Sequence, residues 1–238
     1  MGRGDARARA TPPDGGRLNT MQQLNVVISG FDHYDGVDVN PSLEVPRALA
    51  ARGVDGLDGV EPSIHSASLP VSFAEAWPTL LDVIERVRPH IVIATGLKHT
   101  ARGVMLERCA TNLMQAREPA TDGAPARPTP IDPNGPAAYW TRLPLRAILK
   151  DFTRDGIPAT LSSDAGTFVC NSLFYNLLDW SCGQERATVG FMSLPLVNEA
   201  PHPQRGLPLE QMTRAGEDVV REAVRYYLRP SSGDILIA

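Results

Sequence analysis

The sequence has little of the features that mark several classes of protein. Its three cysteines, Cys109, Cys170 and Cys182, have neither paired nor metal-ligand spacing, so neither a disulfide framework nor a zinc site is expected. No apolar run approaches the length that spans a bilayer, which argues against a membrane protein. The net charge of −4, without a basic stripe beyond the first twenty residues, argues against a nucleic-acid-binding surface. The sequence therefore predicts a soluble globular protein in a reducing, cytoplasmic compartment.

Residues 1–23 differ in composition from the rest of the chain. Gly, Arg, Pro and Asp dominate there and no apolar segment follows the arginines, so a disordered extension is expected, with Met21 as a candidate start. Residues 24–238 are long enough for one domain with a substantial core. Within them, about residues 120–138 are rich in Pro, Asp and Gly, which predicts a protruding arm that pairs with another subunit.

Short β-branched or apolar runs alternate along the chain with segments of helical periodicity. The runs predict strands at about residues 24–29, 64–69, 91–96, 157–162 and 187–194, and the periodic segments predict helices at about 40–51, 73–87, 140–155, 172–180 and 209–228. Such alternation is typical of the α/β class. It predicts a three-layer α/β/α sandwich around a mostly parallel, twisted sheet, with ligands bound in loops at the carboxyl ends of the strands.

The stretch from Asp164 to Asn171 is the strongest functional signal. It lies between a predicted strand and a predicted helix, which places Cys170 at or just before a helix N-terminus. Unpaired N–H groups and the positive end of the helix dipole favour a thiolate there. The alternative is a buried, inert cysteine. The Gly-rich approach to Cys170 favours a nucleophile, because it lets other groups come close to the sulfur.

Two further features are consistent with a site at the strand ends. Phe31 and Tyr34 follow the first strand and are candidate pocket walls, or they pack beneath their own loop. Glu107 lies in a compact, largely apolar segment, so it is either an orienting carboxylate or a surface partner of Arg108. The sequence alone leaves both alternatives open.

Four separated motifs match one family. They are Gly30-Phe31-x-x-Tyr34 with Asn40-Pro41-Ser42; Gly96 to Glu107-Arg108; Gly135-Pro136-x-x-Tyr139-x-x-x-Leu143-Pro144; and Gly156-Ile157-Pro158-Ala159 with Asp164 to Asn171. In this order and spacing the chain resembles the pyroglutamyl peptidase I (pyrrolidone-carboxylate peptidase) family of cysteine peptidases. The resemblance implies an α/β/α fold, often a homotetramer. It also implies hydrolysis of the amide after an N-terminal 5-oxoproline by a Cys-His-Glu triad, without metal or cofactor.

The resemblance assigns roles to residues of this chain. Cys170 matches the nucleophile and Glu107 the triad carboxylate, and Arg117 matches an arginine that would favour the thiolate or a developing oxyanion. The positions that match the wall of the 5-oxoproline pocket are Phe31, Tyr34, Phe168 and Val169.

The chain departs from the family at the triad histidine. The family motif is Gly-Phe-Ile-His-x-Pro, and this chain has Ser193 at the histidine position within residues 190–195. A serine hydroxyl does not accept a proton near neutral pH, so it cannot act as the general base. Leu97 and Glu118 are further departures in the pocket, where many members have Gln and Ile. Weak or altered activity is therefore expected.

Other histidines of the chain are candidates to replace the missing base. His202 lies nine residues beyond Ser193 on the same loop, and His33 and His99 lie on loops at the same strand ends.

Three functions remain open. The first is a weakened or rescued hydrolase acting on a small peptide. The second is acyl transfer, cyclisation or hydrolysis of a non-peptide amide or thioester by the same thiol. The third is a non-catalytic binding protein on the same fold.

Overall fold

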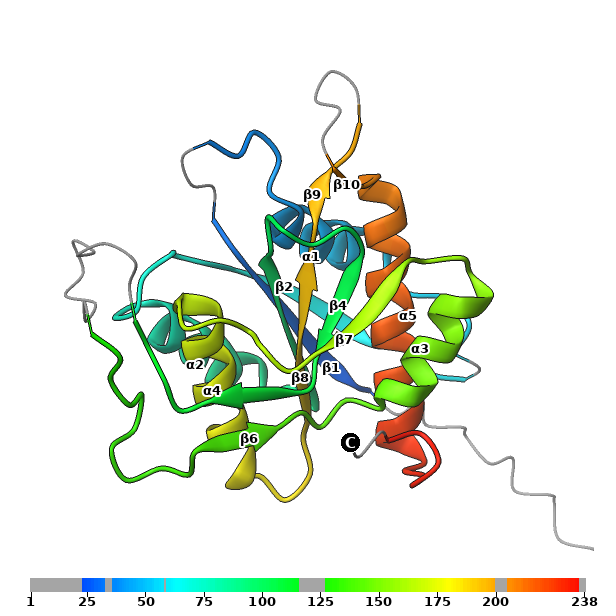
Figure 1. The fold of residues 1–238 in the computed structure, drawn as a ribbon. Helices are drawn as coiled ribbons and strands as arrows, with labels where there is room; N and C mark the ends of the chain where they lie inside the picture. The colour runs from blue at the N-terminus through cyan, green and yellow to red at the C-terminus, as the bar shows by residue number, and fades with distance from the viewer. Residues whose placement is uncertain (1–22, 33–35, 58, 116–126, 200–204, 236–238) are drawn as a thin grey trace, which may run out of the picture.

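The computed structural model describes residues 23–32, 36–57, 59–115, 127–199 and 205–235. The predicted N-terminal extension therefore falls outside the described residues except for Gln23, and the predicted arm is described only from residue 127 onward. Figure 1 shows a central sheet with helices on both faces, as the three-layer prediction required. In the described part of the chain, no helix combines the length and the apolar character that crossing a membrane needs.

Six strands form the sheet in the order β2-β1-β3-β8-β4-β7. These strands are β1 Asn25–Phe31, β2 Ser63–Leu69, β3 Ile91–Leu97, β4 Val104–Glu107, β7 Ala159–Ser162 and β8 Thr188–Leu194. Neighbouring strands run parallel except β4 and β8, which pair antiparallel with Glu107 opposite Phe191. The sheet is thus mostly parallel, and β4 brings its carboxyl end back along the middle of β8.

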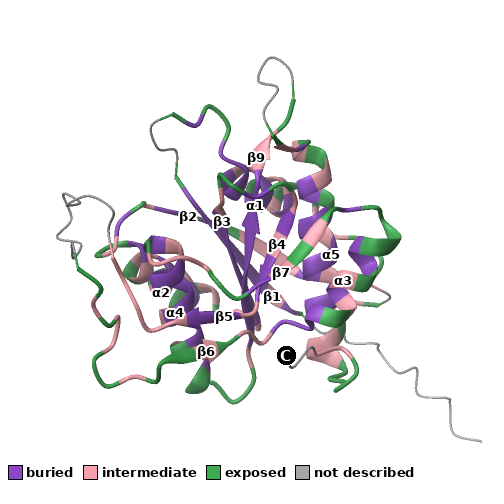
Figure 2. Cartoon of the chain, in the orientation of Figure 1, coloured by how far each residue is buried: buried purple, intermediate pink, exposed green. Residues whose placement is uncertain are grey.

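Two helical layers cover the sheet. On one face lie α1 (Pro41–Arg52), α3 (Leu145–Arg154) and α5 (Leu209–Leu228), and on the other lie α2 (Ala76–Val87) and α4 (Val169–Cys182). The core divides accordingly into two clusters of buried side chains, one under each layer. Figure 2 shows the central strands as the most continuously buried part of the chain. Buried parallel strands need cover on both faces, and the alternation of strand and helix supplies it.

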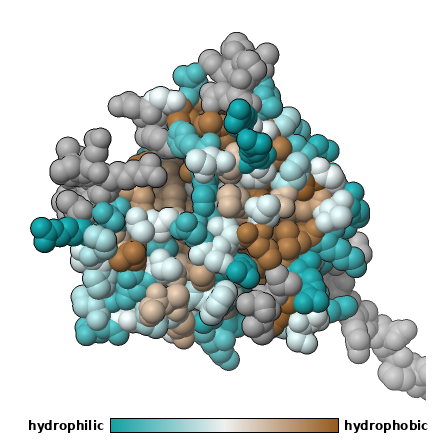
Figure 3. Space-filling model, viewed as in Figure 1, coloured by the Kyte–Doolittle hydropathy of each residue, from teal (hydrophilic) through white to brown (hydrophobic). Residues whose placement is uncertain are grey.

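Short strands lie outside the main sheet. β5 (Cys109–Thr111) pairs antiparallel with β6 (Ala138–Trp140), and β9 (Leu196–Val197) pairs with β10 (Gly206–Leu207). On the face seen in Figure 3, polar side chains predominate. Apolar side chains gather there in a patch at centre right and in a hollow at upper left, above the place of α2 and α4 in Figure 2.

Three sequence predictions of local structure were wrong. The helix predicted from Trp140 begins at Leu145, because Pro144 disfavours helical backbone in the residue before it, and Trp140 belongs to β6 and is 59% exposed. The helix predicted from Phe73 begins at Ala76, after Ser72 accepts hydrogen bonds from the N–H groups of the turn that follows it. The apolar run at 157–162 suggests a buried strand, but β7 lies at the sheet edge, begins only at Ala159 and is partly buried.

Candidate active site

Cys170 is the second residue of α4. The turn before the helix is set by Gly166, whose φ of +82° suits glycine, and by the Asp164 carboxylate, which accepts a hydrogen bond from the Gly166 N–H at 2.9 Å. Phe168, just before the helix, is 44% exposed and packs edge-on against Phe73. The predicted position of Cys170 at the start of a helix is confirmed.

The sheet residues that face Cys170 come from three neighbouring strands. A Cβ atom on Gly96 of β3 would lie 2.8 Å from the Cys170 sulfur and 2.8 Å from the ring of Phe191, so only glycine lets the thiol sit against the strand. In the sheet register Gly96 pairs with Ser193 on β8, and Glu107 on β4 pairs with Phe191. Because residues two apart on a strand share a face, Gly96, Phe191, Ser193 and Glu107 all face α4.

Glu107 is fully buried and accepts a hydrogen bond from the Ser193 hydroxyl at 2.7 Å. Its second carboxylate oxygen, Oε2, has no partner among the described residues. Arg108 instead donates to the Ser163 hydroxyl, so Glu107 is not a surface partner of that arginine. Of the two alternatives that the sequence left open, the structure selects a buried carboxylate inside the site. A buried acceptor without a donor is costly, so this oxygen stands out as a feature that packing alone does not explain.

The ionisation of Cys170 differs from the sequence expectation. Burial, followed by the charge of Glu107, raises the pKa of the Cys170 thiol to about 12. The ammonium of Lys98 and the backbone N–H of Cys170 itself act in the opposite direction and lower that pKa, but their effect is smaller. The helix terminus therefore does not make a thiolate by itself here, because burial and the charge of Glu107 outweigh its effect on the thiol pKa.

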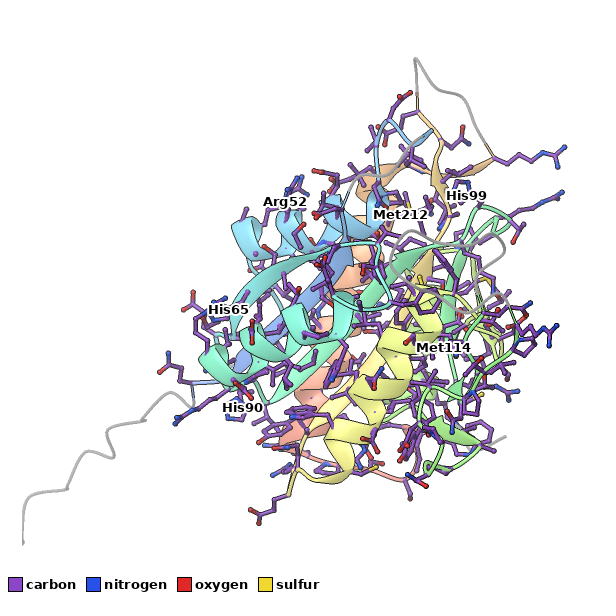
Figure 4. The ribbon with its side chains drawn as sticks, turned by 90° about the vertical axis from the view of Figure 1, so that its left-hand side faces the viewer. Arg52, His65, His90, His99, Met114 and Met212 are labelled. Atoms are coloured by element: carbon purple, nitrogen blue, oxygen red, sulfur yellow. The ribbon has the colours of Figure 1, made fainter. Side chains whose placement is uncertain are left out.

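The described histidines do not occupy the triad position. His90 accepts a hydrogen bond from the Asn25 N–H and packs against Tyr227, and His65 lies within hydrogen-bond distance of Ser63. Figure 4 shows both at the end of the molecule opposite His99, which is exposed and follows β3. The candidate substitute bases His33 and His202 lie outside the described residues.

The pocket-wall residues fall into two groups. Phe31, at the end of β1, and Val169 are almost fully buried in the same core cluster, so they offer little surface to a ligand. Leu97, at the end of β3, and Phe168 keep more exposed surface. The remaining predicted site residues, Tyr34, Arg117 and Glu118, lie outside the described residues.

Asn171 is a positioning residue to which sequence reasoning gave no role. Its amide group donates to the carbonyls of Thr111 and Leu113 and accepts from the Thr111 N–H, at 2.8 to 3.0 Å. A further backbone bond joins the Gln115 N–H to the Thr167 carbonyl at 2.7 Å. These bonds fix the start of α4 against the segment that follows β5. An asparagine directly after a candidate nucleophile was the signal available in the sequence.

No group of three or more His, Cys, Asp and Glu side chains within the described ranges is placed to hold a metal ion. The chemistry that the described side chains offer is that of a thiol beside a carboxylate and a hydroxyl.

Replacing Glu107 with Gln is expected to speed the alkylation of Cys170. The amide keeps an acceptor for Ser193 but removes the charge that raises the thiol pKa, and a fall of about one pKa unit corresponds to a roughly tenfold faster reaction at pH 8. In the unaltered site the rate should climb about tenfold per pH unit from pH 7 to 10 without a plateau, because only the thiolate reacts.

This measurement requires a Cys182→Ser background. Cys109 is buried and Cys170 half-buried, whereas Cys182 is exposed, so Cys182 would otherwise compete for the reagent. The readout is iodoacetamide labelling of the peptide that contains Cys170. The matched control is Glu185→Gln, at an exposed glutamate beyond the far end of α4. Equal labelling rates for Glu107→Gln and the parent protein would show that the carboxylate does not govern the thiol.

Comparison with known proteins gives a consistent result. A family model described as pyroglutamyl peptidase matches residues 24–221. The chain is 40% identical over 173 residues to the pyrrolidone-carboxylate peptidase of Bacillus subtilis, covering 72% of this chain and 78% of that protein. It is 39% identical over 174 residues to the protein of the same name from Pseudomonas fluorescens, covering 73% and 79%.

Solved structures agree with these relatives. The crystal structure of pyroglutamyl peptidase I from Bacillus amyloliquefaciens superposes with a TM-score of 0.76 at 34% identity, covering 84% of this chain and 97% of that one. The pyrrolidone carboxyl peptidase of Thermococcus litoralis gives a TM-score of 0.77 at 30% identity, covering 90% and 99%.

Proposed function

The chain belongs to the pyroglutamyl peptidase family of cysteine peptidases, and from that premise we propose that Cys170 attacks the carbonyl carbon of an N-terminal 5-oxoproline. The observation that carries this proposal is the position of Cys170 at the start of α4, directly against Gly96 and facing Glu107 and Ser193. The family name specifies the substrate group, and the site supplies a thiol where that group would react.

The proposed reaction uses the local geometry of α4. The thiolate forms a bond to the carbonyl carbon, and the carbonyl oxygen becomes an oxyanion. N–H groups in the first turn of a helix lack intrahelical acceptors, so those beside Cys170 are suited to bind that oxyanion. Collapse of the intermediate expels the amine and leaves a thioester on Cys170, which water then hydrolyses.

Three proton transfers accompany these steps. The Cys170 thiol must lose its proton to become the thiolate, the leaving amine must gain a proton, and the attacking water must lose one. Ser193 stands where the family motif has histidine, and a serine hydroxyl carries none of these protons near neutral pH. We therefore propose a weak or altered hydrolase, since loss of one triad member costs several orders of magnitude in rate.

Arg117 and the pocket complete the proposal. For Arg117 we propose the role that the family resemblance implies, which is to favour the thiolate or a developing oxyanion. Leu97 and Phe168, with Tyr34 and Glu118, are proposed to contact the substrate. A small peptide as substrate, a cytoplasmic location and assembly into a dimer or tetramer remain parts of this proposal.

The direct test is hydrolysis of 5-oxoprolyl-aminomethylcoumarin by the full-length protein. We expect slow release of the fluorophore that disappears in Cys170→Ala, and no release from the prolyl analogue, which lacks the 5-oxo group. If His202 serves as a substitute base, His202→Ala removes the remaining turnover; if it does not, the variant matches the parent. Release that persists unchanged in Cys170→Ala would refute the nucleophile assignment.

A second candidate function is favoured by the same serine. A thioester expels a thiolate, which needs no general acid, so loss of the histidine impairs thioester chemistry less than amide hydrolysis. We propose acyl transfer or thioester hydrolysis at Cys170 as the alternative activity. The test compares the rates at which the protein cleaves a 5-oxoprolyl thioester and the corresponding amide. If the ratio of these two rates is no larger than the ratio for free cysteine, the alternative activity is excluded. If the protein cleaves neither substrate, a binding protein on this fold is favoured.

A further inference from the structure

Lys98 directly follows β3 and lies on the side of the sheet that α4 and Cys170 cover. A Cβ atom added to Gly96 of β3 would point at the Cys170 sulfur and lie 2.8 Å from it. The strand ladder continues past Leu97, because the Lys98 N–H donates to the Leu194 carbonyl at 2.8 Å. Since residues two apart on a strand point to the same face, the Lys98 side chain leaves the backbone on the side where Cys170 lies.

A hydrogen bond fixes the end of this side chain. The Lys98 ammonium donates to the backbone carbonyl of Asp164 at 2.7 Å, in the loop that leads into α4 and Cys170. An ammonium group has three donors. Within the described part of the chain, the other two have no acceptor and no carboxylate lies within ion-pair distance of Lys98. The bond holds a positive charge beside the loop that carries the nucleophile without neutralising it.

The charges around the thiol oppose one another. Among the described residues, Glu107 disfavours the thiolate and Lys98 favours it. The chain has only two lysines, Lys98 and Lys150, whereas Lys and Arg together number 23, so almost every other cation is an arginine. Lysine is a compact point charge on a flexible stem and can approach a sulfur atom end-on.

We propose that Lys98 supplies a positive charge that stabilises the Cys170 thiolate in this site, where Ser193 carries no charge. When the thiol ionises, its proton passes to solvent and the negative sulfur remains beside the ammonium. Lys98 acts through Cys170 and is therefore a positioning residue. Its consequence for catalysis rests on the proposed function, but the charge interaction itself does not.

The test measures thiol reactivity without a substrate. In the Cys182→Ser background, the alkylation of Cys170 by iodoacetamide is followed from pH 7 to 10 in Lys98→Met, Lys98→Arg and Lys150→Met. Iodoacetamide is neutral, so its approach is not steered by the lysine. Lys150 is exposed on α3 and provides a control with the same change in net charge.

We expect Lys98→Met to slow alkylation roughly 3- to 10-fold at each pH, which is the effect of raising the thiol pKa by about half a unit to one unit. Lys98→Arg should stay within about twofold of the parent, and Lys150→Met should not differ from it. A urea midpoint measured for each variant verifies folding, and Lys98→Gln replaces Lys98→Met if that variant is unstable.

Two results would overturn the proposal: an alkylation rate for Lys98→Met equal to that of the parent at every pH, or an equal slowing by Lys150→Met. Failure of the proposed function is separate from both, because the protein could fail to hydrolyse any 5-oxoprolyl substrate and still show a Lys98-dependent thiol.

Discussion

Replacing Ser193 with His is expected to raise the hydrolysis of 5-oxoprolyl-aminomethylcoumarin by roughly 100-fold or more, within the 10²- to 10⁴-fold range of general acid–base catalysis. Ser193 already contacts Glu107 at 2.7 Å and pairs in the sheet with Gly96, which has no side chain. An imidazole at this position starts next to the carboxylate and extends toward the Cys170 sulfur that lies over Gly96. It would give Glu107 Oε2 a donor and accept the thiol proton.

Two variants isolate this effect. Ser193→Ala removes the hydroxyl without supplying a base and should leave the rate at the parent value or lower it. Ser193→His combined with Cys170→Ala should be inactive. Activity gained by the double variant would indicate a different nucleophile. A folded Ser193→His protein with no gain at all would mean that the pocket, and not only the base, has diverged.

Replacing Gly30 with Ala is expected to destabilise the protein by about 3 kcal/mol or more, which is the range for a substitution that forces the backbone to move. A Cβ atom on Gly30 would lie 1.5 Å from the Ser42 carbonyl oxygen, at the start of α1. That oxygen also accepts a hydrogen bond from the Thr95 hydroxyl at 2.7 Å, and Asn40 caps α1 and binds the Phe31 carbonyl. The close approach therefore holds the start of α1 against both β1 and β3.

Urea unfolding measures this loss, with Gly183→Ala as the matched control. Gly183 ends α4 with a φ of −83°, and the nearest atom to its Cβ position is 3.6 Å away, so alanine should change stability by less than about 0.5 kcal/mol. A loss below about 1 kcal/mol for Gly30→Ala would mean that α1 does not pack on β1 as closely as described.

Long periodic elements were predictable from the sequence. The terminal helix was predicted at residues 209–228 and α5 has those bounds, while the strand predicted at 187–194 is β8, shorter by one residue. Both have an uninterrupted apolar pattern. The strand β4 was not predicted, because four residues ending in a glutamate give no periodic signal. Its antiparallel position beside β8 creates the Glu107–Ser193 contact between residues 86 positions apart.

The position of Cys170 at a helix start could be predicted from the sequence, and the electrostatics around its sulfur could not. The strand-to-helix pattern around Cys170 predicted that this residue lies at the start of a helix, and the structure confirms it. The direction of the shift in the thiol pKa was not readable from the sequence. It depends first on burial of the sulfur and then on the charges of Glu107 and Lys98, and the pairing of β3, β8 and β4 places both residues on its side of the sheet. The contribution of Gly96 was hidden for the same reason, since it depends on a contact across 74 positions.

Acylation of Cys170 tests the assignment of nucleophile and substrate most directly. The protein in the Cys182→Ser background is mixed with the p-nitrophenyl ester of 5-oxoproline, whose leaving group needs no proton donor, and the digest is examined by mass spectrometry. We expect one 5-oxoprolyl group on the peptide that contains Cys170, persisting because no base speeds its hydrolysis. The prolyl ester should not label this peptide. Equal labelling by both esters, or no label on Cys170, would contradict the assignment.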